Sequence, residues 1–403
     1  MNVLVLDGNE NQAVACVRSL ARAGHRVIVG ANTSWSKAGW SRDASESVRY
    51  PAPQDGAAAF VGAIADIVRR LNGALVLPMT ERTTLPLSEH RDAIIAAGGR
   101  MVLPDHRVVL QAFDKSQTTA LAASLGIATP ATETLISDAD ARQYAEHATF
   151  PVVLKPRSSE EISAAGRVTA TGQPLYATDR ATFFDRFGEM RRRCSAVIVQ
   201  EFIAGEGSGY FALMRHGEVR AEFAHRRLRD VRPTGSGSAL RVSASLDPRV
   251  RDAGRAVLQA LDWHGVAMVE FRVRPDGTPV FLEVNGRFWN SLPLAIYAGV
   301  DFPAMLAEIA ESGDTRTVST YREGVRCRWF LGDTRHVIEV WRGPPNGFPG
   351  EFPRRLSTLA RFLLPVRGTY HDNFTLRDPL PEVGDWLDFV FRRLMRRRRP
   401  RPT

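Results

Sequence analysis

Two glutamates and an asparagine in the segment GVAMVEFRVRPDGTPVFLEVNGRF are the residues best suited to carry chemistry. Two strand-like runs flank a Pro-Asp-Gly turn, which is typical of a β-hairpin. If the Asp-Gly step forms a two-residue loop, Glu270 lies directly opposite Glu283. Asn285 then lies two residues further along the same face. Opposed carboxylates repel unless a cation lies between them, and Mg²⁺ takes such oxygen ligands while nucleotide phosphates complete its shell. The segment therefore predicts a site for Mg²⁺, or Mn²⁺, and a nucleotide.

Two other interpretations of this hairpin remain open. A Pro-Asp-Gly turn also favours a type I turn with a bulge, which would pair Glu270 with Leu282 and separate the two acids. The hairpin could also face solvent, with glutamates that only keep it soluble. Phe271, Val284 and Phe288 surround the acids with apolar bulk, and this favours the metal site.

Four short motifs occur in order along the chain, and the last of them contains the second glutamate of the hairpin. They are DK at Asp114 and Lys115, PVVLKP at 151–156, VQEFIAG at 199–205 and EVNGR at 283–287. Over roughly residues 1–310 they resemble the ATP-grasp superfamily. The resemblance is to carboxylate-amine ligases and to the ATP-binding domains of the carbamoyl phosphate synthase large chain and biotin carboxylase. It implies that ATP lies between a mobile lid and a larger subdomain, behind a Rossmann-like domain.

The resemblance implies nucleotide contacts for two lysines. It assigns Lys155 to the α-phosphate and the adenine edge and Lys115 to a phosphate, because ammonium groups offset the negative charge of a triphosphate. A solvated lysine is the alternative in each case. The lid loop SSEEISAAGRV has a single glycine where relatives have several. Either the hydroxyls of Ser158, Ser159 and Ser163 bind phosphate instead, or the lid closes less tightly.

A hinge after the lid is implied to hold the adenine ring. An extended backbone offers the donor and acceptor that an adenine edge needs, so Glu201 and Ile203 would contribute backbone groups. Many relatives have an acid where this chain has Gln200, so its side chain would contact the adenine amine differently. Glu206 is the candidate partner of the ribose, in a register that could slip by one residue.

A basic stretch, AHRRLRDVRPTGSGSALR, follows the hinge. Guanidinium groups bind phosphate or carboxylate as a fork, and successive amides of a Gly/Ser turn such as 235–238 form an anion nest. The stretch resembles the H-x-R-x-R pattern of carboxylate-amine ligases, which implies catalytic roles for His225, Arg227 and Arg229. Arg287, beside the metal acids, would neutralise the transferred phosphoryl group or hold the acceptor carboxylate. A charged surface strand, and a salt bridge from Arg287 to a glutamate, are the alternatives.

These groups suit the activation of a carboxylate by ATP. Hydroxide is a poor leaving group, so a carboxylate reacts with an amine only after conversion to an acyl phosphate, a step that lysines, arginines and Mg²⁺ promote. The sequence therefore predicts an ATP-dependent carboxylate-amine ligase that releases ADP and phosphate, with small-molecule carboxylate and amine substrates. Phosphoryl transfer to a non-carboxylate acceptor and non-catalytic nucleotide binding are the alternative hypotheses.

The elements that must position these groups begin with a βαβ unit. A strand at residues 3–6, a helix at 13–23 and a strand at 25–30 predict a parallel sheet. A helix at 57–71 and a buried strand at 74–78 continue the alternation. The first turn, DGNENQ, lacks the G-x-G-x-x-G pattern of dinucleotide-binding enzymes, so a nicotinamide cofactor is not expected.

The predicted fold class is α/β, with α+β character in the ATP-grasp part. We expect a Rossmann-like domain at residues 1–112, a lid subdomain at 113–203 and a large subdomain with the metal site at 204–313. A C-terminal extension with a basic tail follows at 314–403. Its WRGPPNGFPGEFPRR segment is too rich in proline and glycine for regular structure, so we expect loops there.

Composition argues against several other classes of protein. Net charge is +9, but seven arginines lie in the last thirteen residues and the remainder carries only +2, so nucleic-acid binding is not expected. Three scattered cysteines support neither a disulfide framework nor a zinc site. No signal peptide or membrane-spanning run is visible, so the chain is expected to be soluble and cytoplasmic. The tail, WLDFVFRRLMRRRRPRPT, predicts a short helix that either packs on the protein or makes weak contact with an anionic membrane.

Overall fold

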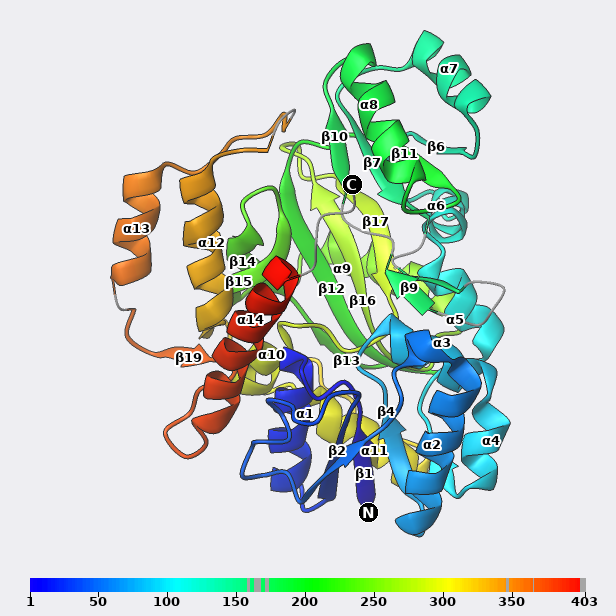
Figure 1. Cartoon of the computed structure of the whole chain (residues 1–403), viewed down its shortest axis with the longest axis vertical. Coiled ribbons are helices and arrows are strands. Elements are labelled where there is room, and N and C mark those ends of the chain that lie inside the picture. The colour runs from blue at the N-terminus through cyan, green and yellow to red at the C-terminus, as the bar shows by residue number, and fades with distance from the viewer. Residues whose placement is uncertain (158–159, 163–167, 171–173, 346–347, 365, 399–403) are drawn as a thin grey trace.

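The computed structural model describes residues 1–157, 160–162, 168–170, 174–345, 348–364 and 366–398. Figure 1 shows an α/β domain at the bottom, a small lid at the top right and a large antiparallel sheet between them. The C-terminal residues descend the left side of the molecule and return to the N-terminal domain.

The N-terminal domain is built on a five-stranded parallel sheet in the order β3-β2-β1-β4-β5. Parallel strands need crossovers, so helices cover both faces of the sheet. One face packs on α1, and the other packs on α2, α3 and α4, which follow a short 3-10 helix, η1 (Pro53–Asp55). The predicted α/β fold is thus confirmed. The elements are β1 (Asn2–Val5), α1 (Asn11–Arg22), β2 (Arg26–Ala31), β3 (Glu46–Arg49), α2 (Ala57–Arg70), β4 (Ala74–Leu77), α3 (Glu81–Glu89), α4 (Arg91–Ala96) and β5 (Gly99–Arg100).

The lid is a four-stranded antiparallel sheet in the order β10-β7-β11-β6, with two helices on one face. Both helices begin at a capping box, in which Ser137 and Asp179 accept a hydrogen bond from the third helical residue. The helices bury Phe183, Phe187 and Met190 against the sheet. The elements are β6 (Thr132–Leu135), α7 (Asp138–His147), β7 (Val152–Pro156), β10 (Leu175–Ala177), α8 (Arg180–Arg191) and β11 (Val197–Glu201).

Between β7 and β10 in the sequence, β8 (Glu160–Ile162) and β9 (Val168–Ala170) pair as a separate two-stranded antiparallel ribbon. Ser158, Ser159 and Ser163, which the sequence suggested as phosphate ligands, lie outside the described residues.

The central sheet is antiparallel in the order β13-β12-β16-β17 and is buried on both faces. One face packs on α5, α6 and α9 through residues such as Tyr210 and Phe271. The other face packs on α10, α11 and the N-terminal domain through residues such as Phe211 and Met268. This arrangement fixes the central sheet against the parallel sheet. The elements are α5 (His106–Phe113), α6 (Lys115–Ser124), β12 (Glu206–Arg215), β13 (Glu218–Phe223), α9 (Pro248–Ala260), β16 (Gly265–Val273), β17 (Pro279–Asn285), α10 (Leu292–Ala298) and α11 (Phe302–Ser312).

The β16–β17 hairpin contains two irregularities that offset each other. Its turn is longer than the predicted two-residue loop: Gly277 N–H donates to Arg274 O at 2.8 Å, and Gly277 has a φ of +84°. This is the three-residue turn with a glycine bulge that would pair Glu270 with Leu282. A second bulge at Leu282 shifts the register back, so that Glu270 pairs with Glu283. The predicted loop is therefore wrong, and the predicted pair of acids is confirmed.

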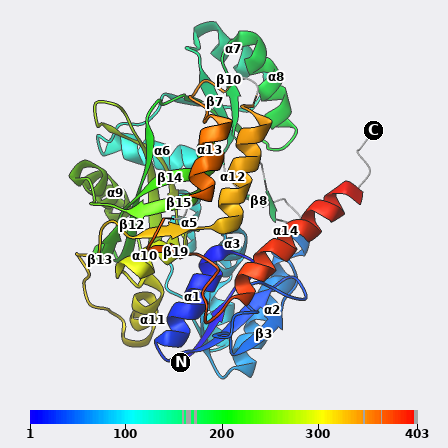
Figure 2. The same ribbon diagram turned by 90° about the vertical axis from the view of Figure 1, so that its left-hand side faces the viewer.

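The C-terminal extension adds two strands to a second antiparallel pair, giving a sheet in the order β14-β15-β18-β19. The described part of the Pro/Gly-rich segment is largely irregular, as predicted, and two helices that the sequence analysis did not predict flank it. A long last helix then packs against the N-terminal domain and α12 (Figure 2). The elements are β14 (His225–Arg232), β15 (Ser236–Ser243), β18 (Arg326–Arg328), α12 (Phe330–Arg342), α13 (Arg355–Leu363), β19 (Thr369–His371) and α14 (Leu380–Arg398).

Among the described residues, no single helix combines the length and apolar character of a membrane span. Helices α10 and α11 meet these criteria only as a pair, which is bent by 87°.

Candidate active site

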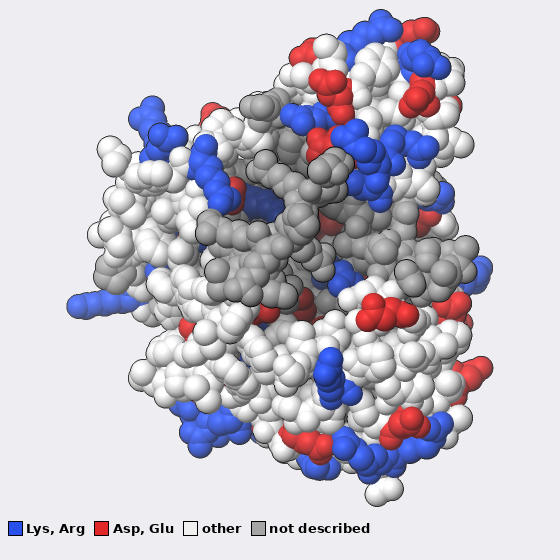
Figure 3. Space-filling view, viewed as in Figure 1, with Lys and Arg blue, Asp and Glu red and all other residues white. Residues whose placement is uncertain are grey.

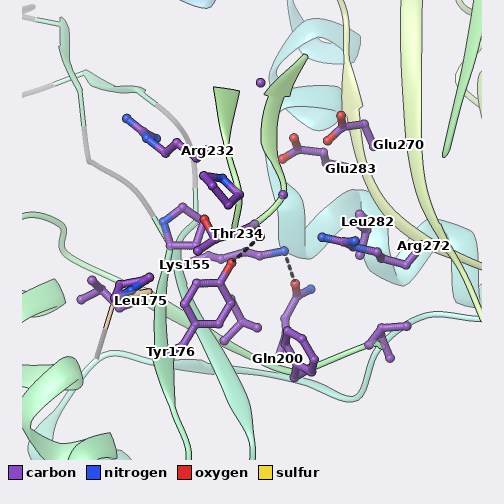
Figure 4. A pocket seen from close by; sticks show the side chains of 18 of the residues that line it. Lys155, Leu175, Tyr176, Gln200, Arg232, Thr234, Glu270, Arg272, Leu282 and Glu283 are labelled. Carbon is purple, nitrogen blue, oxygen red and sulfur yellow. Dashed lines mark hydrogen bonds between the residues drawn. The ribbon is translucent and has the colours of Figure 1, made fainter. Parts of the chain in front are cut away.

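A cavity of about 670 Å³ lies between the lid sheet and the β16–β17 hairpin. Strands β7 and β11 of the lid form one wall, and the hairpin forms the opposite wall with the turn between β14 and β15. Figure 4 shows side chains from all of these elements pointing into the same space. The C-terminal extension closes one side with Glu339, Pro345 and Phe352. Residues from four parts of the sequence therefore meet at one cavity.

The two hairpin acids face each other at one end of this cavity (Figure 4). Their side chains are 22% and 27% exposed, so they are partly removed from water. Burial and the neighbouring Glu283 carboxylate raise the pKa of Glu270. Burial opposes ionisation of Glu283 as well, but the ammonium groups of Lys115 and Lys155 hold its pKa at about 2. Arg227 forms an ion pair with Glu270, and Lys115 Nζ lies 3.4 Å from Glu283 Oε2. The site thus keeps two carboxylates together by surrounding them with cations.

Lys155 lies at the centre of the cavity, on β7 (Figure 4). Burial lowers its pKa, and the field of Glu283 partly restores it. Its Nζ donates to Gln200 Oε1 at 2.8 Å, and Gln200 Nε2 donates to Thr132 Oγ1 at 3.1 Å. The Gln200 side chain is therefore turned along the sheet toward the lysine, and it fixes where the ammonium group lies.

The hinge end of the cavity offers backbone atoms and apolar side chains. Glu201 N–H donates to Ala131 O at 2.9 Å and Phe202 N–H donates to Pro151 O at 3.2 Å, so the sheet uses both donors. Ile203, which follows them, also lines the cavity. The contact of this hinge with adenine stays a prediction, in which Ile203 rather than Glu201 would supply the N–H group.

Glu206 does not share this location. It lies at the start of β12, is exposed and is not among the residues that line the cavity. The suggested contact between Glu206 and a ribose stays a prediction that the geometry does not favour.

The three residues of the H-x-R-x-R stretch have different surroundings. Only Arg227 lines the cavity. Arg229 forms two hydrogen bonds of 2.6 Å with the buried carboxylate of Asp333. His225 is buried, stacks on Phe211 and lies 2.8 Å from Ser291 Oγ through Nε2; burial, with Arg227 and Arg241 nearby, lowers its pKa well below the usual value. The register of β14 shifts twice between Arg227 and residue 230, so Arg229 does not follow Arg227 into the cavity.

Asn285 and Arg287 continue from the acid pair toward a second cavity. Asn285 Nδ2 lies 3.4 Å from Glu283 Oε1, and Arg287 Nη2 donates to Asn285 Oδ1 at 3.1 Å. The same guanidinium lies 3.9 Å from Glu81 Oε1. The alternative considered for Arg287, a salt bridge to Glu270 or Glu283, is not seen among the described residues; its acidic neighbour is Glu81 of the N-terminal domain.

The second cavity, of about 350 Å³, lies at the carboxyl ends of β1, β2 and β4. In the strand order 3-2-1-4-5 this is the point where the chain switches direction across the sheet, which is where open α/β sheets bind ligands. Its lining mixes acids with two arginines, among them Glu10, Glu81, Arg82 and Arg287. Asp7 shapes the floor, since its carboxylate accepts hydrogen bonds from the side chains of two threonines, at 80 and 83, and from Tyr50.

Several cavity residues were not predicted from the sequence, among them Arg272, Leu282, Tyr176 and Arg232. Arg272 lies two residues after Glu270 on the same strand face, and strand alternation could have identified it. Leu282 lines the cavity because it lies at the bulge, and no simple sequence pattern predicts a bulge there. Tyr176, whose hydroxyl lies 3.4 Å from Thr234 O, comes from a segment with no recognisable motif, and Arg232 belongs to the basic stretch 224–241 but was not singled out within it.

The donor set suits a hard divalent cation that is only partly held by protein. Among the described residues, no group of three or more His, Cys, Asp and Glu side chains is close enough to bind a metal ion. Two carboxylates and an amide oxygen are too few for a closed protein shell, but they match Mg²⁺, which keeps waters and binds substrate phosphates. The lysines beside the acids provide positive charge for those phosphates. The residues therefore fit Mg²⁺ together with a nucleotide.

Sequence comparison finds a distant relative. No family model matches the chain. The vancomycin/teicoplanin A-type resistance protein VanA of Enterococcus faecium is 28% identical over 187 residues. The match covers 43% of this chain and 51% of VanA, so the chain spans about half the length of this relative.

Solved structures with the same fold are more numerous. An L-amino acid ligase from Bacillus licheniformis matches with a TM-score of 0.60 and 16% identity, covering 77% of this chain and 74% of that protein. The biotin carboxylase domain of a Hydrogenobacter thermophilus 2-oxoglutarate carboxylase, solved with MgADP and bicarbonate, matches with a TM-score of 0.63 and 16% identity over 81% and 73% of the two chains. N5-carboxyaminoimidazole synthetase from Staphylococcus aureus matches at 0.61 and 11% over 81% and 80%. Identities this low establish the fold alone: the chain has the ATP-grasp fold, preceded by a parallel α/β domain.

Proposed function

We propose that this protein is an ATP-dependent carboxylate-amine ligase that forms an amide through an acyl phosphate and releases ADP and phosphate. The observation that carries the proposal is the position of the acid pair. Glu270 and Glu283 face each other in a cavity with Lys115 and Lys155, and Arg287 leads from that pair to a second polar cavity. The nucleotide would occupy the first cavity and the acceptor the second, with the phosphates of the nucleotide directed toward the acceptor.

The reaction needs two bond exchanges. A carboxylate oxygen of the acid substrate attacks the γ-phosphorus of ATP, the bond from that phosphorus to the bridging oxygen breaks, and ADP leaves. The amine nitrogen of the second substrate then attacks the acyl carbon, loses a proton, and phosphate leaves with its electron pair. No side-chain nucleophile is required, so positioning and electrostatic stabilisation supply the catalysis.

The residues have separate roles in this scheme. Lys155, held by Gln200, and Lys115 would offset the charge of the phosphates. Glu270, Glu283 and Asn285 would hold Mg²⁺, which supplies Lewis-acid stabilisation of the phosphoryl oxygens when bound. Arg227 and Lys115 contact these acids in the structure. With the carboxylates bound to a divalent cation, both side chains would be available to contact phosphate. Arg287 would hold the acceptor carboxylate as a two-pronged donor.

The second cavity suits the acid substrate. It lies on the far side of Arg287 from the nucleotide cavity, and its acidic and basic lining residues could pair with a substrate that carries charges of both signs. VanA and the L-amino acid ligase, which share sequence or fold with this chain, support a ligase rather than another ATP-grasp activity.

The test is product analysis with ATP, Mg²⁺ and pools of small acids and amines. We expect ADP and free phosphate in equal amounts, with a new amide detected by mass spectrometry. AMP as the main product, or ADP with a phosphorylated acceptor and no free phosphate, would overturn the ligase proposal. A Glu283→Gln protein run in parallel controls for contaminating ATPases.

A further inference from the structure

The last two helices carry apolar side chains on faces that nothing in the described chain covers. Leu356 and Leu363 of α13 and Leu364, which follows its last residue, are 79%, 66% and 64% exposed. The spacing of seven residues places Leu356 and Leu363 on one side of the helix. An exposed leucine is ordinary when it stands alone, but three at one helix form a patch that needs an explanation.

Helix α14 has a second apolar stripe of the same kind. Leu380, Val383, Leu387 and Val390 follow one another at steps of three, four and three residues, and all are exposed, as is Phe391. The opposite side of α14 is anchored in the protein, where the buried Asp385 lies 2.8 Å from the ammonium group of Lys37. Because that side of α14 is buried, the apolar stripe faces away from the protein.

Both apolar faces lie beside clusters of arginine in the sequence, and the acids of α14, Glu382, Asp385 and Asp388, all lie before its arginines. The segment 354–370 contains four arginines and no Asp or Glu, and residues 389–403 contain seven arginines and no Asp or Glu. Figure 2 shows α12, α13 and α14 on one side of the molecule, with the C-terminal half of α14 projecting beyond the rest of the chain. In Figure 3 the left-hand part, over α12 and α13, is mostly uncharged, with Lys and Arg at its edge.

We propose that the exposed apolar faces of α13 and α14, each with a cluster of arginines near it in the sequence, dock on the surface of a bilayer that contains anionic lipids. Leucine, valine and phenylalanine side chains enter the boundary between headgroups and acyl chains, and arginines bind lipid phosphates beside them. Basic residues near an anionic leaflet add to this binding in a salt-dependent way. The inference stands independently of the proposed ligase activity.

Charge favours this occupant over two others. A second copy of the chain would bring the same arginine clusters together across a two-fold interface, and like charges at close range repel. A nucleic acid would bind the arginines but would leave the leucine faces in water. A membrane surface satisfies both kinds of side chain at once.

The experiment uses the full chain and vesicles of phosphatidylcholine with or without phosphatidylserine. We expect the protein to sediment with the anionic vesicles at low salt, to release at high salt, and to ignore neutral vesicles. Two variants separate the contributions: Leu363→Glu with Leu364→Glu removes the apolar face of α13, and deletion from Arg392 onward removes the charge. Each should lower the partition coefficient on the order of tenfold or more.

The matched control is Ile136→Glu, which changes an apolar side chain with a similar exposure of 62% on the lid, far from these faces. It should leave vesicle binding unchanged, and thermal unfolding checks that every variant is folded. Equal binding to neutral and anionic vesicles, or no binding, overturns the proposal. So does a dimer in analytical ultracentrifugation that Leu387→Glu dissociates, or nucleic-acid binding that the leucine variants do not weaken.

Discussion

At the scale of single residues, the acid pair lies among cationic side chains. Glu270 contacts Arg227 and Glu283 contacts Lys115, so each carboxylate has a positive neighbour. The pKa of Glu270 is raised and that of Glu283 is lowered, because only Glu283 lies beside both lysines. A pair of acids set apart in this way is a frequent sign of a functional site.

Replacing Glu283 by Gln should lower the rate of ADP formation by about 10²–10³-fold, comparable to the loss of one preorganised electrostatic group elsewhere. The amide keeps the shape of the side chain but cannot balance Lys115 or a divalent cation. Steady-state assays with titrated Mg²⁺ measure the effect. Glu218→Gln, an exposed glutamate on β13, is the control and should retain full activity. Comparable rates for the two variants would exclude Glu283 from the metal site.

Arg287→Lys should raise KM for the acid substrate by about tenfold or more while leaving KM for ATP within about twofold, because lysine keeps the charge but loses the fork. The reason lies in its position: its guanidinium contacts Asn285 on one side and approaches Glu81 of the second cavity on the other. Initial rates with each substrate varied in turn give both constants. A rise in KM for ATP alone would move Arg287 to the nucleotide.

The sequence identified part of the site at this scale. Hairpin pairing placed Glu270 opposite Glu283, but through a two-residue loop that the structure does not have; the bulge at Leu282, which the sequence did not predict, restores that pairing. The H-x-R-x-R resemblance grouped His225 and Arg229 with Arg227, but only Arg227 lines the cavity, and the register of β14 shifts between Arg227 and Arg229. A register shift depends on neighbouring strands, and a motif does not contain that information.

At the scale of elements, α14 carries an acid in an unusual setting. Burial and the nearby Asp385 raise the pKa of Glu382 to about 7, although Trp386 Nε1 donates to Glu382 Oε1 at 2.9 Å and Lys37 opposes the shift. The folded protein thus retains a proton that the unfolded chain releases near pH 4.5. Folding stability contributed by this group is present below that pH and is lost as pH rises toward 7.

Glu382→Gln should therefore stabilise the protein at pH 8 by about 1–2 kcal/mol, after allowance for partial exposure, and change little at pH 4.5. Glutamine keeps the acceptor for Trp386 and carries no charge. Urea unfolding at several pH values gives the comparison. Asp388→Asn on the same helix is the control. An identical pH dependence in wild type and Glu382→Gln would mean that Glu382 is ionised in the fold.

Elements with strong periodicity were predicted well from sequence, and those of the C-terminal extension were not. The alternating strands and helices of the first domain follow from local apolar patterns. Helices α12 and α13 lie on either side of a Pro/Gly-rich segment, and the composition of that segment led to a prediction of loops. Their helical state depends on packing, for example the stacking of Phe330 on Phe362 at 5.9 Å, and a single segment does not reveal its partners.

At the scale of the whole molecule, buried ion pairs attach the C-terminal extension to earlier parts of the chain. Arg241 of β15 pairs with Asp372, and both side chains are fully buried. Arg18 of α1 pairs with Asp378 at 2.9 Å. Such pairs contribute little net stability when intact, but an unpartnered buried charge is costly.

Asp372→Ala should accordingly lower the free energy of unfolding by about 3–5 kcal/mol, because Arg241 remains buried without its carboxylate. The double variant Arg241→Met with Asp372→Leu should recover most of that loss. Denaturant unfolding of the three proteins measures the energies. A loss below about 1 kcal/mol for Asp372→Ala would show that water reaches Arg241, since solvated pairs contribute that little.

The order of domains could be predicted from the sequence, but their attachment by the extension could not. Asp372 and Arg241 are 131 positions apart, and Asp385 and Lys37 are 348 apart. Nothing local marks a lysine near the N-terminus as the partner of an aspartate near the other end. These contacts arise only from the packing of the complete chain.

The pairing of Lys37 with Asp385 has a consequence for biosynthesis. A ribosome makes the N-terminal domain first, and domains generally fold in the order in which they emerge. Here the nascent domain carries Lys37 and Arg18 in positions whose acidic partners are translated more than three hundred residues later. Until α14 emerges, these cations stay hydrated and that face of the domain stays open. The first domain to be synthesised is therefore among the last to mature.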